Sequence, residues 1–181
     1  MTYIFLARGF EEIEALTAVD MMRRAGIQIR TVSLMESKMV YGAHDIGVEA
    51  DLLFGECDFA HCRMMILPGG YEGTMNMMNH REFLMRLKEY AESGGFVAAI
   101  CAAPMVLARA SVLGGHEATI YDGMESELLD ASYVKRDVVA SGNVVTARGP
   151  GLATEFASKL IEILAGRDAL DEVRRGMLIE D

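Results

Sequence analysis

Strand-like and helix-like segments alternate along the chain, and this alternation limits the folds it can adopt. Strands are predicted at residues 2–7, 27–34, 64–67 and 96–100, and helices at 11–25, 81–93, 102–108 and 152–164. Strands that alternate with helices favour a mainly parallel sheet covered by helices on both faces. Ligands of such sheets bind beyond the carboxyl ends of the strands. We therefore expect the functional residues at that edge.

The other segments of the chain give weaker signals. Residues 38–53 are ambiguous and fit a small hairpin followed by a short connection. A second hairpin is predicted from residues 138–140 and 144–147. We also expect a strand at 117–121, one helical turn at 125–129 and a short last helix at 168–175. At 181 residues without a repeat or linker, the chain is predicted to form one domain.

Composition and charge exclude several classes of partner. The net charge is −10, and no basic stripe offsets it, so we expect no nucleic-acid partner. No apolar run approaches the roughly 20 residues of a membrane span, and the first residues form a strand rather than a signal peptide. The three cysteines are an odd number, which argues against a disulfide scaffold. The sequence therefore predicts a cytoplasmic protein with no membrane partner.

Cys101 stands where a predicted strand passes directly into a predicted helix, with Pro104 near the helix start. Such a sharp turn lifts a nucleophile clear of the sheet. A helix N-terminus also favours the thiolate over the thiol. These features favour a reactive cysteine, and a buried, inert cysteine is the alternative. Cys57 and Cys62 lack a second cysteine pair or nearby paired histidines, so we expect no zinc site.

Three carboxylates, Glu11, Glu12 and Glu14, open the first predicted helix, where the helix dipole favours negative charge. Simple capping explains Glu12. Glu14 heads an apolar stripe that continues through Ala18 and Met21, so burial should raise its pKa. Glu11 shares nearly the same face, and periodicity does not choose between Glu11 and Glu14.

Gly69 and Gly70 follow a predicted strand. They are either plain turn residues or a source of backbone N–H groups for an oxyanion. If the strands that precede Gly69 and Cys101 lie beside the first strand, a carboxylate, backbone amides and a thiol meet at one edge. No histidine adjoins Cys101 in the sequence, and we keep His44 as a candidate pocket residue. The other histidines are expected at the surface or at helix ends.

Four motifs occur in register along the chain: Gly9–Glu14, Leu67–Gly70, Ala98–Pro104 and Thr146–Gly151. With these motifs the chain resembles the DJ-1/ThiJ/PfpI superfamily, and it is most similar to the bacterial DJ-1/ThiJ branch. The resemblance implies one DJ-1/PfpI domain over residues 1–181. It also implies a flavodoxin-like three-layer α/β/α sandwich of the class I glutamine amidotransferase type, and a homodimer.

The resemblance further implies roles for individual residues. Cys101 matches the reactive nucleophile, and Glu14 matches the carboxyl that donates a hydrogen bond to its sulfur. That role requires a Glu14 that is protonated or shares a proton, because an ionised neighbour opposes thiolate formation. Gly70 and Ala102 match the backbone positions that can bind an oxyanion or an oxidised sulfur.

Two departures from the family pattern bear on the chemistry. Members proposed to act on glyoxals often carry a histidine where this chain has Tyr121, although bacterial relatives also have tyrosine there. Asp122 replaces the neighbouring proline. Tyrosine is a weak base at neutral pH, which puts histidine-assisted proton transfer in doubt. The protease-like branch places a histidine directly after the cysteine, and Ala102 here argues against a peptidase.

Three functions remain open at this point. The first is a cofactor-independent enzyme of glyoxalase III or deglycase type, which uses neither a metal nor an organic cofactor. Its partner is a small carbonyl substrate such as methylglyoxal. The second is a non-enzymatic oxidation sensor or redox chaperone, in which the cysteine stops at sulfinate. The third follows the ThiJ label to thiamine precursor (hydroxyethylthiazole monophosphate) metabolism, for which no residue here selects a substrate.

Overall fold

The computed structural model describes residues 1–179, and its centre is a seven-stranded sheet. In spatial order the strands are β10 (Val138–Ser141), β11 (Val144–Ala147), β7 (Phe96–Ile100), β6 (Met64–Leu67), β1 (Thr2–Leu6), β2 (Ile29–Ser33) and β5 (Leu52–Leu53). All neighbouring strands are parallel except β10 and β11, which form the predicted hairpin. The mainly parallel sheet is therefore confirmed.

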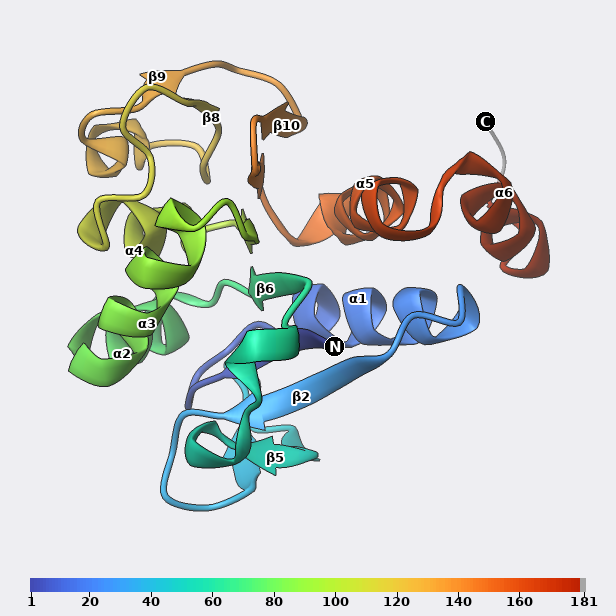
Figure 1. Cartoon of the computed structure of the whole chain (residues 1–181), viewed down its shortest axis with the longest axis horizontal. Coiled ribbons are helices and arrows are strands. Elements are labelled where there is room, and N and C mark those ends of the chain that lie inside the picture. Colours follow the sequence, from blue (N-terminus) through green and yellow to red (C-terminus); the bar gives the residue numbers. More distant parts are fainter. Residues whose placement is uncertain (180–181) are drawn as a thin grey trace.

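Helices cover both faces of this sheet. One group comprises α1 (Glu12–Arg24), α5 (Ala153–Ala165) and α6 (Arg167–Gly176), and the other α2 (Tyr71–Asn79), α3 (Arg81–Glu92) and α4 (Pro104–Arg109). Figure 1 shows the two groups lying apart, with strands between them. Side chains of a strand alternate between faces, so Ile4 and Leu6 pack in the core on the α1–α5 side, and Tyr3 and Phe5 in the core on the other. This arrangement is the predicted three-layer sandwich.

The ambiguous segment forms an antiparallel hairpin of β3 (Met39–Tyr41) and β4 (Gly47–Glu49), followed by the edge strand β5. The remaining short helices are 3₁₀: η1 (Phe54–Glu56), η2 (Phe59–His61), η3 (Glu125–Leu128) and η4 (Pro150–Leu152). The helical turn predicted at 125–129 is η3. Nowhere in residues 1–179 is a helix long and apolar enough to cross a membrane. The predicted domain continues to residue 181, and its last two residues lie outside the described part.

Two elements differ from the sequence-based expectations. Helix α2 was not anticipated, because it has only nine residues, begins directly after the Gly70 turn and contains Gly73. The strand expected at 117–121 was wrong in length. Only β8 (Glu117–Ala118) forms, and it pairs with β9 (Ser132–Tyr133) outside the main sheet. Beyond Ala118, the Thr119 N–H donates to the side chain of Thr146 instead of entering a strand ladder.

The order of strands brings three turns together. β6 lies between β1 and β7, so the turns that follow these strands meet at one edge of the sheet. In the β6–β7 pair, Leu67 stands opposite Ala99. The residues just beyond them, Gly69 and Cys101, therefore lie close together.

Candidate active site

Cys101 directly follows β7 and adopts a left-handed backbone conformation with φ of 64°. This conformation is uncommon for a residue other than glycine and must be held by its surroundings. The Cys101 N–H donates to the Ala147 carbonyl oxygen at 2.9 Å, and the Cys101 carbonyl accepts from the Tyr121 N–H at 3.0 Å. The predicted sharp turn is present, and it leaves the cysteine half-buried.

Glu14 reaches the cysteine from the first turn of α1 and is fully buried. Its Oε2 accepts a hydrogen bond of 2.6 Å from the Gly69 N–H. Its Oε1 makes no regular hydrogen bond within the described residues, and the Cys101 thiol is the side chain that interacts with the carboxyl. Glu11 instead is the N-cap of α1, and its Oε2 accepts from the Glu14 N–H at 2.8 Å. The structure thus selects Glu14, which periodicity left undecided.

The two glycines do more than make a turn. A Cβ atom on Gly69 would lie 2.7 Å from both the Cys101 Cβ and the Glu14 Oε2, so no larger residue fits there without displacement. Gly70 has a φ of 84°, a conformation that glycine adopts readily. The Gly70 and Ala102 N–H groups both face the Cys101 sulfur. Thiol, carboxyl and two backbone donors therefore converge at one point.

The charges of Glu14 and Cys101 are coupled. Burial raises the pKa of Glu14 to about 7, and the charge of Glu11 adds to this effect. Burial, followed by the charge and hydrogen bond of Glu14, raises the pKa of Cys101 to about 12, although the Gly70 and Ala102 N–H groups oppose the shift. A thiolate is therefore disfavoured while Glu14 is ionised. When Glu14 holds a proton the repulsion disappears, and the carboxyl can donate to sulfur.

The expected help from a helix dipole does not dominate. Helix α4 has six residues and begins at Pro104, so Cys101 lies in the turn that precedes it. Dipole effects fall off within one turn of a helix end, whereas burial acts on the sulfur directly. The expected preference of the helix N-terminus for the thiolate is therefore outweighed by burial, which raises the pKa of Cys101.

His44 lies in the loop of the β3–β4 hairpin and binds Glu12 rather than Cys101. Its backbone N–H donates to Glu12 Oε1 at 2.7 Å, and its ring Nδ1 lies 2.8 Å from Glu12 Oε2. The hydrogen bond between the two side chains raises the pKa of His44. Atoms of Glu11, Glu12 and His44 that could bind a metal lie within 4.8 Å of one another. Because hydrogen bonds within the protein already engage both oxygens of Glu12 and one of Glu11, we assign no metal site.

The other sequence candidate, Tyr121, contacts the sharp turn at Cys101 between β7 and α4, here called the elbow, through its backbone. Tyr121 is 48% exposed, and its ring lies against Gly149. A groove of about 480 Å³ runs beside the ring and is lined by Tyr121, Asp122, Asp137, Arg148, Gly149, Pro150, Gly151 and Leu152. All four histidines belong to the described residues, and none is hydrogen-bonded to Cys101. Besides His44, these are His61, which bonds to Asp58, His80, which accepts from the Phe83 N–H, and His116, which bonds to the Ser141 carbonyl oxygen.

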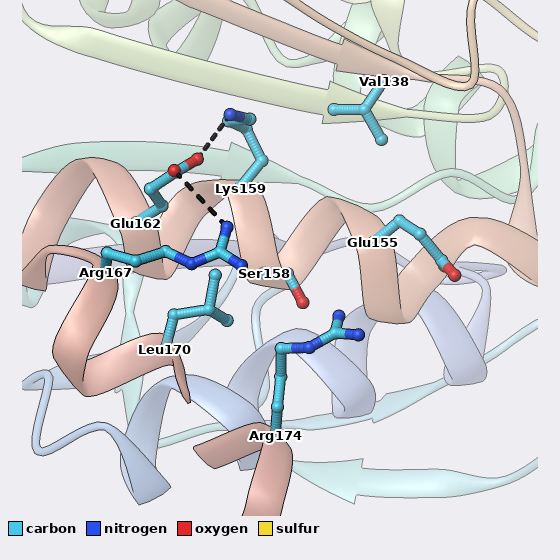
Figure 2. Close-up of a pocket in the computed structure, with 8 residues that line it drawn as sticks. All are labelled: Val138, Glu155, Ser158, Lys159, Glu162, Arg167, Leu170 and Arg174. Carbon is cyan, nitrogen blue, oxygen red and sulfur yellow. Dashed lines mark hydrogen bonds and ion pairs between the residues drawn. The ribbon is translucent and has the colours of Figure 1, made fainter. Parts of the chain in front are cut away.

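A second hollow is lined by residues of β10, α5 and α6. Figure 2 shows it along α5 and α6, with a volume of about 330 Å³. Glu162 pairs there with Lys159 and Arg167, as the dashed lines mark. None of the predicted site residues lines this hollow. The converging groups around Cys101, rather than this hollow, form the candidate active site.

The profile of the DJ-1/PfpI family matches residues 2–163. The chain belongs to the DJ-1/PfpI family. The resemblance inferred from the four motifs is thereby confirmed, and in this DJ-1/PfpI protein the motifs supply Glu14, Gly69, Gly70 and Cys101, which the fold brings together.

Several relatives match over nearly their full length. Protein dj-1beta of Drosophila melanogaster is 39% identical over 179 residues, which cover 97% of this chain and 95% of the relative. Its crystal structure superposes with a TM-score of 0.95 at 37% identity, covering 99% of this chain and 98% of that one. Deglycase PfpI of Pyrococcus furiosus is 29% identical over 167 residues, or 91% of this chain and 99% of the relative. A solved structure of oxidized Toxoplasma gondii DJ-1 has a TM-score of 0.90 at 29% identity, covering 98% and 97%.

Replacing Glu14 by Gln should stabilise the protein more at pH 8 than at pH 4. The pKa of Glu14 rises from 4.5 to about 7. Between these values the native state binds more protons than the unfolded state, so the free energy of unfolding falls as pH rises. The loss reaches roughly 3 kcal/mol above pH 7, and a neutral Gln avoids it. Urea unfolding at both pH values measures the difference.

Asp20→Asn, an exposed change on the same helix, serves as the control for the Glu14→Gln experiment. We expect its effect on the free energy of unfolding to vary little with pH. An equal effect of Glu14→Gln at pH 4 and pH 8 would contradict the buried, proton-holding carboxyl.

Proposed function

We propose that the protein is a cysteine-dependent enzyme that acts on reactive 1,2-dicarbonyls or on glycated groups, of glyoxalase III or deglycase type. One observation carries the proposal: the Cys101 sulfur faces two backbone N–H groups and a carboxyl whose pKa is about 7. The family relative named Deglycase PfpI supports the same class of chemistry. The absence of a histidine directly after Cys101 argues against a peptidase.

The proposed reaction begins with addition of the Cys101 sulfur to the aldehyde carbon of the dicarbonyl. The carbonyl electron pair moves to oxygen, and the Gly70 and Ala102 N–H groups stabilise the resulting negative charge. Proton uptake by this oxygen gives a hemithioacetal. Glu14 then moves a proton from the former aldehyde carbon to the neighbouring carbon, while the hydroxyl proton passes to the neighbouring carbonyl oxygen, and this leaves the thioester of a 2-hydroxy acid. Water cleaves the thioester into a hydroxy acid and the free thiol. The net reaction is therefore the conversion of a dicarbonyl and water to a hydroxy acid.

The pKa of Glu14 suits this role. A general acid–base group works best when its pKa lies near the working pH, because both forms are then populated. At about 7 the carboxyl can give a proton in one step and take one in another. The tyrosine at position 121 need not act as a base in this scheme. Glycated thiols and amines carry the same carbonyl-derived adducts, which extends the proposal to deglycation.

Cys101→Ser should reduce formation of lactate from methylglyoxal by at least about a hundredfold, since a serine hydroxyl without a strong base is a poor nucleophile. Glu14→Gln should also lose turnover, because the amide cannot carry the proton. Cys57→Ser, which changes a thiol outside the site, is the control and should turn over normally. Product is measured by chromatography. Undiminished turnover in Cys101→Ser would overturn the proposed mechanism.

A second candidate function is oxidation sensing, and the same geometry favours it. Two N–H groups and a protonated carboxyl can hold the oxygens of a Cys101 sulfinate. The relative from Toxoplasma gondii has been solved in an oxidized form. Neither function requires a metal or an organic cofactor.

Mild peroxide should oxidise Cys101 before the other two cysteines. Burial raises the pKa of all three thiols, to about 12 for both Cys57 and Cys101, so thiol acidity does not separate them. Among the described residues, Cys101 is the cysteine whose sulfur faces the Gly70 and Ala102 N–H groups and the Glu14 carboxyl, and these groups stabilise an oxidised sulfur. Peptide mass spectrometry over time measures the three rates. Earlier oxidation of Cys57 or Cys62 would count against a sensor at Cys101.

We also propose that a second copy of the chain covers the outer face of α1 and the β3–β4 hairpin. His44 holds the hairpin loop against Glu12 of α1. Large exposed apolar side chains lie on these two elements or on the loop between the strands: Ile13, Leu16, Met39, Tyr41 and Ile46. An exposed apolar cluster of this kind marks an interaction surface, and the homodimer expected from the resemblance would bury it.

Ile13→Glu should convert the protein from dimer to monomer, because a carboxylate at the interface would lose its hydration without a partner. Light scattering after size-exclusion chromatography measures the mass. Met85→Glu, at an exposed position on α3, should remain dimeric. A monomeric wild-type protein would contradict this proposal.

A further inference from the structure

The segment after β8 crosses the elbow without belonging to a strand. β8 ends at Ala118, yet the Tyr121 N–H donates to the Cys101 carbonyl oxygen at 3.0 Å. Side chains of β11 and the residue after it hold this segment in place. Thr119 N–H donates to Thr146 Oγ1 at 2.9 Å on one side of Tyr121. Asp122 binds Arg148 on the other side.

The Arg148–Asp122 pair has the geometry of a strong ion pair. Arg148 Nη2 lies 2.8 Å from both Asp122 oxygens, and Nε lies 3.1 Å from Oδ1. Multiple parallel N–H···O bonds fix orientation as well as distance. Arg148 Nη1 also donates to Asp137 Oδ1 at 2.9 Å. The guanidinium group is therefore held from two sides, and the Arg148 side chain is only one-quarter exposed.

Each partner of this ion pair directly follows a residue that is hydrogen-bonded to the backbone of Cys101. Asp122 directly follows Tyr121, which donates to the Cys101 carbonyl, and Arg148 directly follows Ala147, which accepts from the Cys101 N–H. The ion pair thus ties together the two backbone segments that grip Cys101. A cysteine in the left-handed conformation persists only where its surroundings hold it. The ion pair therefore helps to hold the backbone of Cys101 in this conformation.

We propose that Arg148 and Asp122 form a clamp that positions the elbow. The clamp fixes the segments of Tyr121 and Ala147 on either side of Cys101, and so keeps the sulfur aimed at the Gly70 and Ala102 N–H groups. Arg148 and Asp122 are positioning residues, because they act through the backbone of their neighbours. The inference rests on the proposed nucleophilic role of Cys101 and adds two residues to it.

A purely structural ion pair is the competing explanation. Arg136 and Glu117 form such a pair on exposed side chains beside β8, and exposed pairs contribute little to stability. Neither of these residues adjoins a hydrogen-bond partner of Cys101. The two pairs therefore differ in the property that the proposal invokes, and Glu117→Gln is the matched control.

The test measures the rate at which iodoacetamide alkylates Cys101, followed by peptide mass spectrometry over a range of pH. Asp122→Asn and Arg148→Ala should each slow alkylation at neutral pH about tenfold, because the sulfur loses its aligned donors. Their pH profiles should shift upward. Glu117→Gln should match the wild type, and so should Asp137→Asn, which leaves the Arg148–Asp122 pair intact.

Salt provides an independent readout. The Asp122 side chain is 53% exposed, so high ionic strength should weaken the pair and slow alkylation in the wild type more than in Asp122→Asn. Circular dichroism confirms folding, and the nearly isosteric Asp122→Asn decides the matter if Arg148→Ala does not fold. An alkylation rate and pH profile in Asp122→Asn equal to those of the wild type, or faster alkylation, would overturn the clamp. A wild type that fails to turn over methylglyoxal would instead remove the proposed enzyme activity and leave this result standing.

Discussion

The pairing of β6 with both β1 and β7 is the constraint on which the site depends. A parallel ladder places the ends of neighbouring strands at the same edge, and here it places the turns after these three strands within hydrogen-bonding reach. β6 contributes Gly69 and Gly70, β7 contributes Cys101, and β1 leads into the helix that carries Glu14. A slip of one residue in the β6–β7 register would move Gly69 away from Cys101 and turn every side chain of that strand to the opposite face.

This arrangement buries the carboxyl of Glu14, and its burial lowers the stability of the fold. A fully buried Glu14 loses its hydration, and one hydrogen bond from Gly69 does not restore it, so its pKa rises. Proteins retain such groups where function uses them, and perturbed titrations concentrate at active sites. The left-handed backbone of Cys101 is a second unfavourable feature within the same few residues. Two such features side by side support the proposal that this local geometry serves chemistry.

Some of this geometry can be read from the sequence, and some cannot. The apolar runs and their alternation with helices predicted the parallel sheet, and the strand–cysteine–helix segment predicted the turn at Cys101. Periodicity could not separate Glu14 from Glu11, because the choice depends on which residue becomes the N-cap. Glu11 takes that position and turns its side chain back to the Glu14 N–H. Such a local competition between hydrogen bonds leaves no trace in hydrophobic spacing.

Other features escaped because they depend on residues distant in the chain. Residues 119–121 have strand-like composition, but Thr146 supplies the hydrogen-bond acceptor for Thr119, which removes that N–H from a strand ladder. The pairing of Arg148 with Asp122 joins residues that no local pattern connects. The helix start was expected to favour the thiolate of Cys101. Burial and the Glu14 charge raise its pKa instead, and they outweigh the dipole of a short helix that begins only at Pro104.

The site is built to hold one negative charge and one proton. The Gly70 and Ala102 N–H groups favour an anion at any pH, whereas Glu14 favours one on sulfur only while it is protonated. Gly69 fixes Oε2 of Glu14, so Oε1 is the carboxyl oxygen left to exchange a proton with the reacting atoms. Turnover requires that Glu14 lose and regain this proton, whereas oxidation sensing requires only that Glu14 keep it. A Glu14 pKa near neutrality supports turnover, because neither protonation state of Glu14 is then costly to reach.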